Sequence, residues 1–390
     1  MTEIVCEIEF DENSTRVCYS GQLLKGQATI YFPVDTHVKA IYVTFSGRGF
    51  CQWDDGEPIS IGSIVYLDER LDFLPQRPDG DTIVRAGHNK YPFQIQLSRT
   101  LPTSYEGTYG YIRYITSLHI ECSRSAQTLH PLEELFTIIK PLNLNSSSSS
   151  YQTPMMVRKY VKFSQFWLVF CCKTDDIKMS GRLPVRGYCP GQAINLKLTV
   201  INSSFLPILH FQVLFIQEVT YTANNGRQKV ERIVLSDRKT AGCRADHPGR
   251  QIINVSTLVP SLPPTNFSAN VCGSRYKIEV TAQTPMFHEN PKFEIPVVIG
   301  TYPISNELYS SSNAAENQAS LNSTLSSAPP PDNLLSASSE SINTSDVPPY
   351  PDEDPPTYEE ASRNGLTGNS FVPKYPTYRM QTSYANEQEP

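Results

Sequence analysis

The chain has 390 residues, enough for two domains of ordinary size and a further stretch of about 85 residues. Charged residues make up 18% of it, and the formal net charge is −6. Residues 1–305 carry 30 basic and 27 acidic side chains, whereas residues 306–390 carry 3 and 12, so the acidity belongs to the C-terminal part. This composition argues against a purely basic nucleic-acid binder, a collagen-like fibre and a disulfide-rich miniprotein.

The N-terminal sixteen residues and the cysteines indicate a cytoplasmic protein. Acidic residues stand where a secretory signal peptide would need a basic start and an apolar run. The longest apolar stretch, 166–172, is far shorter than the roughly 20 residues of a membrane-spanning helix. The nine cysteines form no Cys-x-x-Cys pair, which favours reduced, buried thiols. Cys243 and His247 lack the second ligand pair of a zinc site, so we predict no metal.

Alternating apolar and polar residues predict β-strands throughout residues 1–305. In Ala193–Val200, the residues Ile194, Leu196, Leu198 and Val200 share one face of a strand. Similar alternation occurs at 41–45, 114–120 and 276–280, and turn signals occur at 46–49, 78–80, 224–226 and 247–249. Leu129–Phe136 could supply one or two helical turns. Short strands with frequent turns predict antiparallel β-sandwiches.

A polar, Ser-rich stretch at 143–151 divides this β-rich body almost equally. We therefore predict a first sandwich over 1–145, a linker over 146–156 and a second sandwich over 157–305. Residues 306–390 contain only 10 Val, Ile, Leu and Phe in 85 residues, together with many Pro and Ser, so we expect a disordered acidic tail.

No motif of a known catalytic site occurs in the chain. There is no P-loop, HExxH or GxSxG sequence, and the seven histidines are scattered. The acidic pairs Asp54-Asp55 and Glu133-Glu134 are interpreted as solvated loop charges. A triad assembled from distant positions remains possible, but we predict no catalytic residue and no cofactor.

The tail contains one full PPxY motif, formed by Pro355, Pro356 and Tyr358. Consecutive prolines favour a polyproline II segment, which loses little backbone entropy when it docks between aromatic side chains. The tyrosine then fills an adjoining pocket, which is the ligand geometry of WW domains. Phosphorylation of Tyr358 is expected to oppose this docking, because it adds charge to a ring that must enter an apolar pocket.

The shorter Pro-x-Tyr core occurs four times in the tail, whereas about 0.8 would be expected by chance from its composition. None of the 15 tyrosines in residues 1–305 has proline two positions before it. Several weak sites on one chain can bind a multi-WW partner well, because the second contact is intramolecular. The predicted WW-binding residues outside the PPxY motif are Pro348, Tyr350, Pro373, Tyr375, Pro376 and Tyr378.

The body resembles the arrestin-domain-containing proteins, the α-arrestins. In the first half, the sequences at 91–97, 101–107 and 110–114 are similar to that family's run "YPFxFxLP, LPxSFEG, GxxRY". In the second half, Gly187-Tyr-Cys-Pro-Gly191, the strand at 194–200, Asn202-Ser-Ser204 and the closing segment at 295–301 are also similar. We expect Gly187 and Gly191 to form a turn and not to bind a ligand, with Cys189 packed inside.

The resemblance implies two tandem arrestin-type, immunoglobulin-like sandwiches that act as a non-enzymatic adaptor. Such adaptors recruit WW-domain HECT-type ubiquitin ligases through PPxY and present membrane receptors or transporters for ubiquitination, endocytosis and endosomal sorting. The expected location is cytoplasmic, with peripheral association at the plasma membrane and endosomes. No nucleic acid is expected as a partner. Leu334–Ser338 lacks the acidic fifth residue of a clathrin box.

Several basic residues that follow the boundary are candidates for cargo contact. Basic residues after the boundary could meet phosphorylated cargo tails or anionic lipid, or they could be solvated strand charges. These residues are Arg158, Lys159, Lys162, Lys173, Lys178, Arg182 and Arg186, of which the first five are the predicted contacts. Alternative functions are a structural sorting or coat scaffold without ligase recruitment, an enzyme, and an extracellular adhesion sandwich, against which the missing secretion signal argues.

Overall fold

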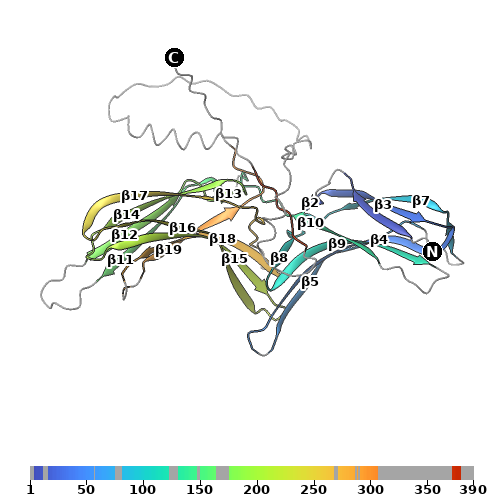
Figure 1. Ribbon diagram of the computed structural model, residues 1–390, viewed down its shortest axis with the longest axis horizontal. Helices are drawn as coiled ribbons and strands as arrows, with labels where there is room; N and C mark the ends of the chain where they lie inside the picture. Colours follow the sequence, from blue (N-terminus) through green and yellow to red (C-terminus); the bar gives the residue numbers. More distant parts are fainter. Residues whose placement is uncertain are drawn as a thin grey trace, which may run out of the picture.

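The computed structural model describes residues 4–11, 16–56, 58–74, 81–122, 131–146, 150–163, 175–267, 271–285, 288, 290–305 and 371–378 (Figure 1). Within these residues nearly all regular structure is β-strand, and the one helix is a short 3-10 turn, η1 (Ser150–Gln152). None of the described helical structure is long and apolar enough to cross a membrane. The predicted all-β class with two sandwiches is confirmed.

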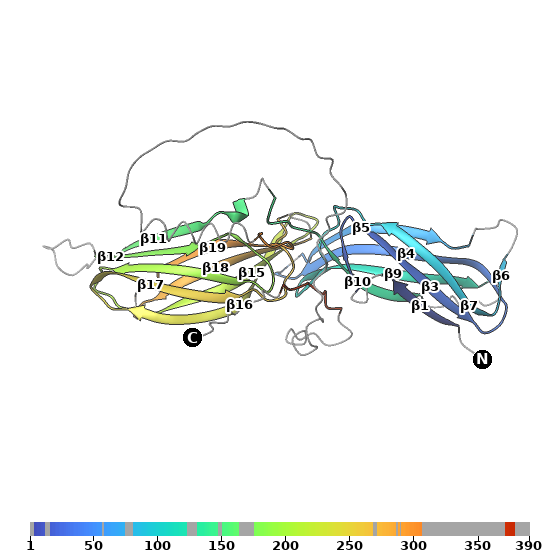
Figure 2. The ribbon, with the colours of Figure 1, turned by 90° about the horizontal axis from the view of Figure 1, so that it is seen from above.

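The first sandwich packs a three-stranded sheet, β1-β3-β7, on a larger sheet of order β2-β10-β9-β4-β5, with β6 beside β4 and β8 beside β9 (Figure 2). All pairs are antiparallel except β2 with β10. The strands are β1 (Val5–Phe10), β2 (Val17–Tyr19), β3 (Leu23–Phe32), β4 (Thr36–Trp53), β5 (Ser60–Asp72), β6 (Thr82–Val84), β7 (Gly87–Gln96), β8 (Tyr105–Gly107), β9 (Gly110–Cys122) and β10 (Leu132–Ile139).

The second sandwich packs a sheet of order β11-β12-β14-β17 on a sheet of order β13-β19-β18-β15-β16. The pairing of β13 with β19 is parallel, and the other pairs are antiparallel. The strands are β11 (Met155–Phe163), β12 (Asp175–Leu183), β13 (Gly187–Tyr188), β14 (Ala193–Asn202), β15 (Ile208–Thr222), β16 (Gln228–Cys243), β17 (His247–Leu258), β18 (Cys272–Gln283) and β19 (Lys292–Ile299).

The alternation seen in the sequence corresponds to the inner faces of these sheets. In β14, Ile194, Leu196, Leu198 and Val200 are buried and the residues between them are exposed or half-buried. Burial also follows the predicted apolar positions in β4, β9 and β18. Because one face of each sheet is removed from water, the hydrophobic effect specifies the register of each strand.

Four local predictions were wrong. His247–Gly249 is not a turn but the start of β17. In the predicted helical stretch Leu129–Phe136, the last five residues are not helical but begin β10, which pairs with β9 and β2. Glu133 and Glu134 therefore lie in a strand and not in a loop. Ser46–Gly49 is not a turn but the middle of β4, where the register with β5 shifts by a bulge between Gly47 and Arg48. Glycine is required there, because a Cβ on Gly47 would lie 2.5 Å from the buried Tyr114 ring.

The two sandwiches repeat the same hydrogen-bonded framework. In the first, Tyr114 donates from its hydroxyl to the Pro102 carbonyl at 2.7 Å, and Ser104 accepts the Ile138 N–H at 2.9 Å. In the second, Tyr276 donates to the Pro263 carbonyl at 2.7 Å, and Thr265 accepts the Ile299 N–H at 2.8 Å.

A glycine turn repeats in the same way before β3 and β14. Gly21 and Gly191 have φ values of +89° and +90°. Each turn is closed by a glutamine side chain that accepts a backbone N–H: Gln22 accepts from Tyr19, and Gln192 accepts from Cys189. The shared framework indicates that the sandwiches are structural repeats of one another, although their sequences show no obvious repeat.

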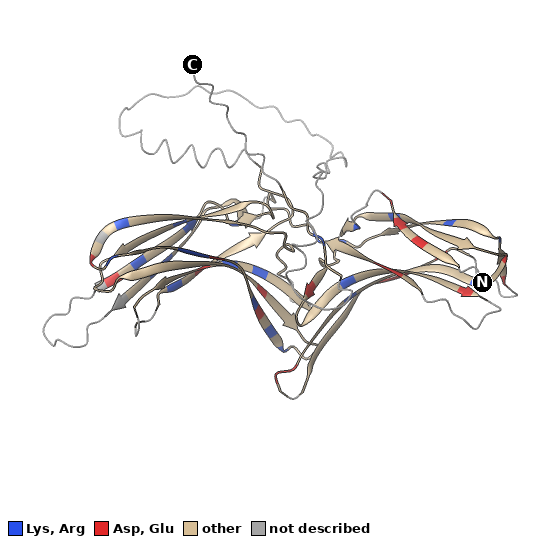
Figure 3. Ribbon diagram, viewed as in Figure 1, with Lys and Arg blue, Asp and Glu red and all other residues tan. Residues whose placement is uncertain are grey.

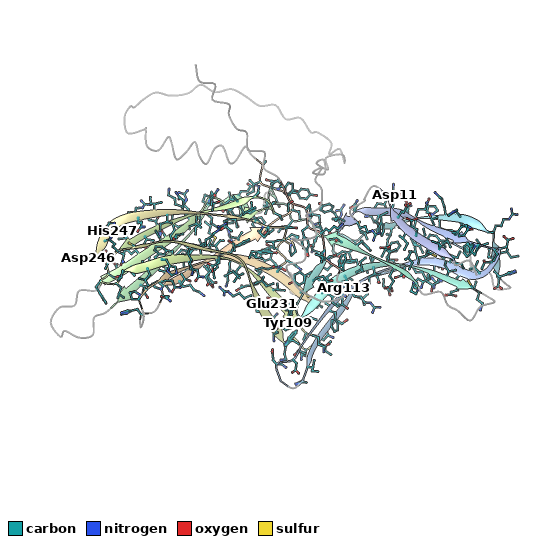
Figure 4. The ribbon with its side chains drawn as sticks, viewed as in Figure 1. Asp11, Tyr109, Arg113, Glu231, Asp246 and His247 are labelled. Carbon is teal, nitrogen blue, oxygen red and sulfur yellow. The ribbon has the colours of Figure 1, made fainter. Side chains whose placement is uncertain are left out.

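The end of the β15–β16 hairpin joins the sandwiches by packing against the β4–β5 hairpin of the first one (Figure 1). Tyr221, from the second sandwich, is fully buried in the hydrophobic core of the first, together with Val219 and Cys272. Its ring packs edge-to-face on Tyr109 at 5.5 Å, and its hydroxyl donates to Glu231 at 2.8 Å. Figure 4 places Tyr109 and Glu231 beside one another at this junction. The two sandwiches therefore share apolar packing.

The connection between the sandwiches is built into the second one. Leu144 is fully buried in its core, and Asn145 hydrogen-bonds the Pro303 carbonyl and the Ser305 N–H. Thr301 hydrogen-bonds both backbone groups of Leu142. The last residues of the predicted first domain and the first residues after β19 thus form one structural unit.

Candidate docking site at the sandwich junction

Eight residues of the C-terminal tail, Phe371–Tyr378, lie across the junction of the two sandwiches (Figures 1 and 2). We call them the docked segment. They contain two of the four Pro-x-Tyr cores, Pro373-Lys-Tyr375 and Pro376-Thr-Tyr378. The docked segment has no regular secondary structure, so its backbone groups need partners outside it.

The first sandwich supplies two hydrogen-bond partners, one for a backbone group of the segment and one for a side chain. Thr137, buried in β10, accepts the Lys374 N–H through Oγ1 at 3.2 Å. The Ser104 carbonyl accepts the Tyr375 hydroxyl at 2.8 Å. Because Ser104 is itself bonded to Ile138 in β10 through its N–H and its Oγ, its carbonyl is held in one direction.

The second sandwich supplies three. Ser261 donates from its hydroxyl to the Tyr375 carbonyl at 2.7 Å. The Pro190 carbonyl accepts the Tyr378 N–H at 2.9 Å, and the Thr301 carbonyl accepts the Tyr378 hydroxyl. Tyr375 therefore bridges the sandwiches, since its hydroxyl binds one and its carbonyl binds the other.

Both tyrosine side chains of the docked segment are half-buried, and both hydroxyls are bonded to the body. Burial raises the pKa of Tyr375 well above 10, and nearby Tyr105 and Glu106 add to the shift. Burial also raises the pKa of Tyr378 above its ordinary value. Both side chains are therefore neutral hydrogen-bond donors at physiological pH, which matches their two carbonyl acceptors.

Gly191 lets the docked segment approach the second sandwich. A Cβ at this position would lie 2.0 Å from the Tyr378 carbonyl oxygen, so any side chain would collide with the segment. The expected turn is confirmed at Gly191 by its φ of +90°, whereas Gly187 lies not in the turn but in β13. The sequence did not reveal the second requirement for glycine at position 191. Cys189 is fully buried, as expected, and burial raises the pKa of its thiol to about 12.

The packing around the docked segment is tight. The gap that remains has a volume of about 10 Å³, enough for roughly one water molecule. It is lined by Ile139, Pro190, Leu262, Pro264, Gly300, Thr301, Tyr375 and Pro376. This gap beside the peptide is too small for a small-molecule substrate.

The other predicted WW-binding residues lie outside the described part of the chain. These are Pro348, Tyr350, Pro355, Pro356 and Tyr358. Their binding role stays a prediction. The structure brings together Pro373, Tyr375, Pro376 and Tyr378, but on the body of the same chain.

The predicted basic residues do not form a single cluster. Arg158 and Lys159 are exposed on the edge strand β11, and Lys178 is exposed on β12, 3.1 Å from Asp176. The register places Arg158 and Lys178 on the outer face, whereas Lys159 is paired with the buried Met179 and points to the other side. Lys162 lies in β11, and Lys173 lies outside the described residues.

Sequence reasoning missed one basic residue of this outer face, Lys197, which is exposed on β14 opposite Arg182. It is visible in the sequence as a polar position of an alternating strand, but only the strand order places it beside β12. Figure 3 shows basic residues distributed along the strands of the second sandwich.

The acidic pairs have partners that their sequence does not reveal. Asp55 forms an ion pair with Lys229 across the two hairpins, and Glu134 forms one with Arg16. Arg113 (labelled in Figure 4) binds Glu106 at 2.5 Å and 2.8 Å through two guanidinium nitrogens. Among the described residues, no three His, Cys, Asp or Glu side chains gather as metal ligands would. These carboxylates connect strands and hairpins.

Comparison with known proteins finds two matching domain families. Residues 6–145 match the arrestin (or S-antigen) N-terminal domain family, and residues 173–304 match the arrestin (or S-antigen) C-terminal domain family. Together these matches span most of the chain.

Curated relatives are also similar over most of their length. Arrestin domain-containing protein 4 of Mus musculus is 24% identical over 87% of this chain and 83% of its own. Arrestin domain-containing protein 17 of Caenorhabditis elegans is 23% identical over 77% of this chain and 71% of its own. Arrestin domain-containing protein 1 of Homo sapiens is 30% identical over 74% of this chain and 63% of its own.

Proposed function

Because the chain belongs to the arrestin-domain-containing proteins and is of the α-arrestin type, we propose that it recruits WW-domain HECT-type ubiquitin ligases to membrane-protein cargo. Membership of the family supports the more general role, an arrestin-like adaptor or scaffold that is not an enzyme. The proposed outcome is ubiquitination of receptors or transporters, followed by endocytosis and endosomal sorting, with peripheral contact at the plasma membrane and endosomes.

The observation that carries this proposal is the repetition of one ligand motif in the tail of a two-sandwich body. The tyrosines of the four Pro-x-Tyr cores lie between positions 350 and 378, a span of 29 residues. One of these cores belongs to a full PPxY motif. A chain with several such cores gains affinity for a partner with several WW domains, because binding of one core raises the effective concentration of the next.

The test is ligase co-purification from cells with the full chain. Tyr358→Ala removes the ring that fills the tyrosine pocket of a WW domain, so most of the co-purified ligase should be lost, while the thermal unfolding midpoint should not change. If ligase binding persists after Tyr350, Tyr375 and Tyr378 are also replaced, the tail is not the docking element.

Phosphorylation provides a second test of the same contact. A synthetic peptide spanning residues 351–362 should bind an isolated WW domain more weakly when Tyr358 carries a phosphate, because the charge must be desolvated on entering the pocket. Equal affinity of the two peptides would contradict the proposed docking mode.

We further propose that the outer face carrying Arg158 and Lys178 contacts anionic lipid during cargo capture. A lysine or arginine near an anionic membrane surface contributes about 1 kcal/mol of attraction to the lipid. Arg158→Glu with Lys178→Glu should weaken co-sedimentation with phosphatidylserine-containing vesicles. Lys159→Glu is the matched control, since Lys159 points away from that face; equal losses in both variants would refute the assignment.

A further inference from the structure

We propose that the junction of the two sandwiches is a binding site for Pro-x-Tyr segments, and that the docked segment Phe371–Tyr378 occupies it in competition with WW domains. This inference rests on the proposed function, since it says which of the tail motifs are available to a ligase. In the docked state Tyr375 and Tyr378 are bound by the body, and a ligase is left with the cores of Tyr350 and Tyr358.

The first argument is that the contacts are specific for this segment. Both tyrosine hydroxyls donate to backbone carbonyls, those of Ser104 and Thr301. Phenylalanine would leave these acceptors unsatisfied, so the site selects tyrosine over a ring of the same shape. Pro373 is buried as well, so the proline and the tyrosine of that core are both recognised.

The second argument is that the site exists only when both sandwiches are in place. Thr137 and the Ser104 carbonyl come from the first sandwich, and Ser261, Pro190 and Thr301 come from the second. The docked segment can therefore make all of its hydrogen bonds only when the two sandwiches keep their relative position. Any rearrangement at the junction would separate its two sets of partners.

The third argument is that docking and WW binding exclude each other. A WW domain holds the proline and the tyrosine ring of its ligand between and beside aromatic side chains. In the docked segment Pro373 is buried, Tyr378 packs against the core of the second sandwich, and the Tyr375 hydroxyl is bonded to the Ser104 carbonyl. A WW domain must displace the segment to reach either tyrosine.

Competition of this kind has a measurable size. Docking is intramolecular, with roughly 65 residues between Ser305 and Phe371, so the body always competes at a high effective concentration. If the segment is docked about nine-tenths of the time, the apparent affinity of a WW domain for these two cores falls about tenfold.

The experiment uses the full chain with Tyr350→Ala and Tyr358→Ala, so that only the docked cores remain, and the tandem WW domains of a HECT-type ligase as the probe. A synthetic peptide of residues 369–381 should bind the probe about tenfold more tightly than this full chain does. Gly191→Ala, added to the full chain, should restore affinity toward that of the peptide, because its methyl group collides with Tyr378.

Gly21→Ala is the matched control. It places the same strain in the equivalent turn of the first sandwich, where φ is +89° and the new methyl group meets only the Arg99 side chain. This variant should leave the affinity low. Ser261→Ala, which removes one donor to the docked segment without backbone strain, should raise the affinity and serves if Gly191→Ala does not fold.

Hydrogen exchange of the same proteins separates the inference from the proposed function. The Tyr378 amide, which donates to Pro190, should be protected in the full chain and exposed in Gly191→Ala, whether or not any WW domain binds. Absence of that protection, or equal WW affinity of peptide and full chain, would overturn the inference. Failure of the peptide to bind the probe would count against the ligase proposal for these cores and, with it, against competition.

Discussion

Buried thiols give individual residues of this protein a direct effect on its stability. Cys18 and Cys189 are almost fully buried, and burial raises the pKa of each thiol from its ordinary value of 9.0 to about 12. Burial raises the thiol pKa because a thiolate would lose its hydration without gaining a partner. The folded protein therefore holds these protons at a pH at which the unfolded chain releases them.

Stability should accordingly decrease above pH 9. Below pH 9 each thiol contributes its full stabilisation to the folded state. Between pH 9 and pH 12 this contribution should fall by about 1.4 kcal/mol per pH unit for each thiol. Urea unfolding in reducing buffer at pH 8 and pH 10 measures this change. Cys18→Ala should show a shallower decline than the unmodified protein, and an identical decline in both would contradict the assignment.

At the scale of the elements, each sandwich is closed by one side-chain oxygen that ties a loop to a strand. The Ser104 Oγ accepts the N–H of Ile138 in β10, and the Thr265 Oγ1 accepts the N–H of Ile299 in β19. Both isoleucines are fully buried, so neither N–H group can bond to bulk water instead. The hydroxyl therefore completes the hydrogen bonding of the strand.

Replacing either hydroxyl should destabilise its sandwich. Thr265→Ala leaves the buried Ile299 N–H without an acceptor, which costs about 1–3 kcal/mol. Thr265→Ser keeps the oxygen and should recover most of that loss. The free energy of unfolding from urea titration measures both variants; equal destabilisation by Ala and Ser would mean that the methyl group, and not the hydrogen bond, is responsible.

At the scale of the whole molecule, the two sandwiches are coupled by residues that come from one half of the sequence and pack in the hydrophobic core of the other sandwich. Tyr221 extends from β15 into the first hydrophobic core, and Leu144 enters the second core from the first half of the chain. The docked segment adds hydrogen bonds to both sandwiches. We therefore expect the sandwiches to unfold together.

Removing the Tyr221 ring should uncouple them. Tyr221→Ala creates a cavity at the junction and should lower stability by about 3–5 kcal/mol, as for other buried aromatic residues. Differential scanning calorimetry should show one transition for the unmodified protein and two for Tyr221→Ala. Tyr221→Phe keeps the ring and should keep one transition; a single transition in Tyr221→Ala would indicate that other contacts suffice for coupling.

Much of the fold could be predicted because it depends on a local pattern. The two-residue alternation in β14 places Leu196 and Leu198 inside wherever that strand lies in the sheet. The structure of segments without such a pattern was harder to predict from the sequence. Leu132–Phe136 reads as a helix or a strand by itself, and only its pairing with β9 makes it a strand. The close contact of Gly47 with Tyr114 likewise joins residues 67 positions apart.

By itself, the sequence determined the β class, the two-sandwich body and the positions of the Pro-x-Tyr cores, since all of these are properties of adjacent residues. Only the tertiary structure decided that Tyr375 and Tyr378 lie on the body. That result depends on the Ser104 and Thr301 carbonyls and on Gly191, which are distant from the segment and from one another in the chain. Backbone carbonyls carry no signal in the sequence, because every residue has one and only folding gives it a direction.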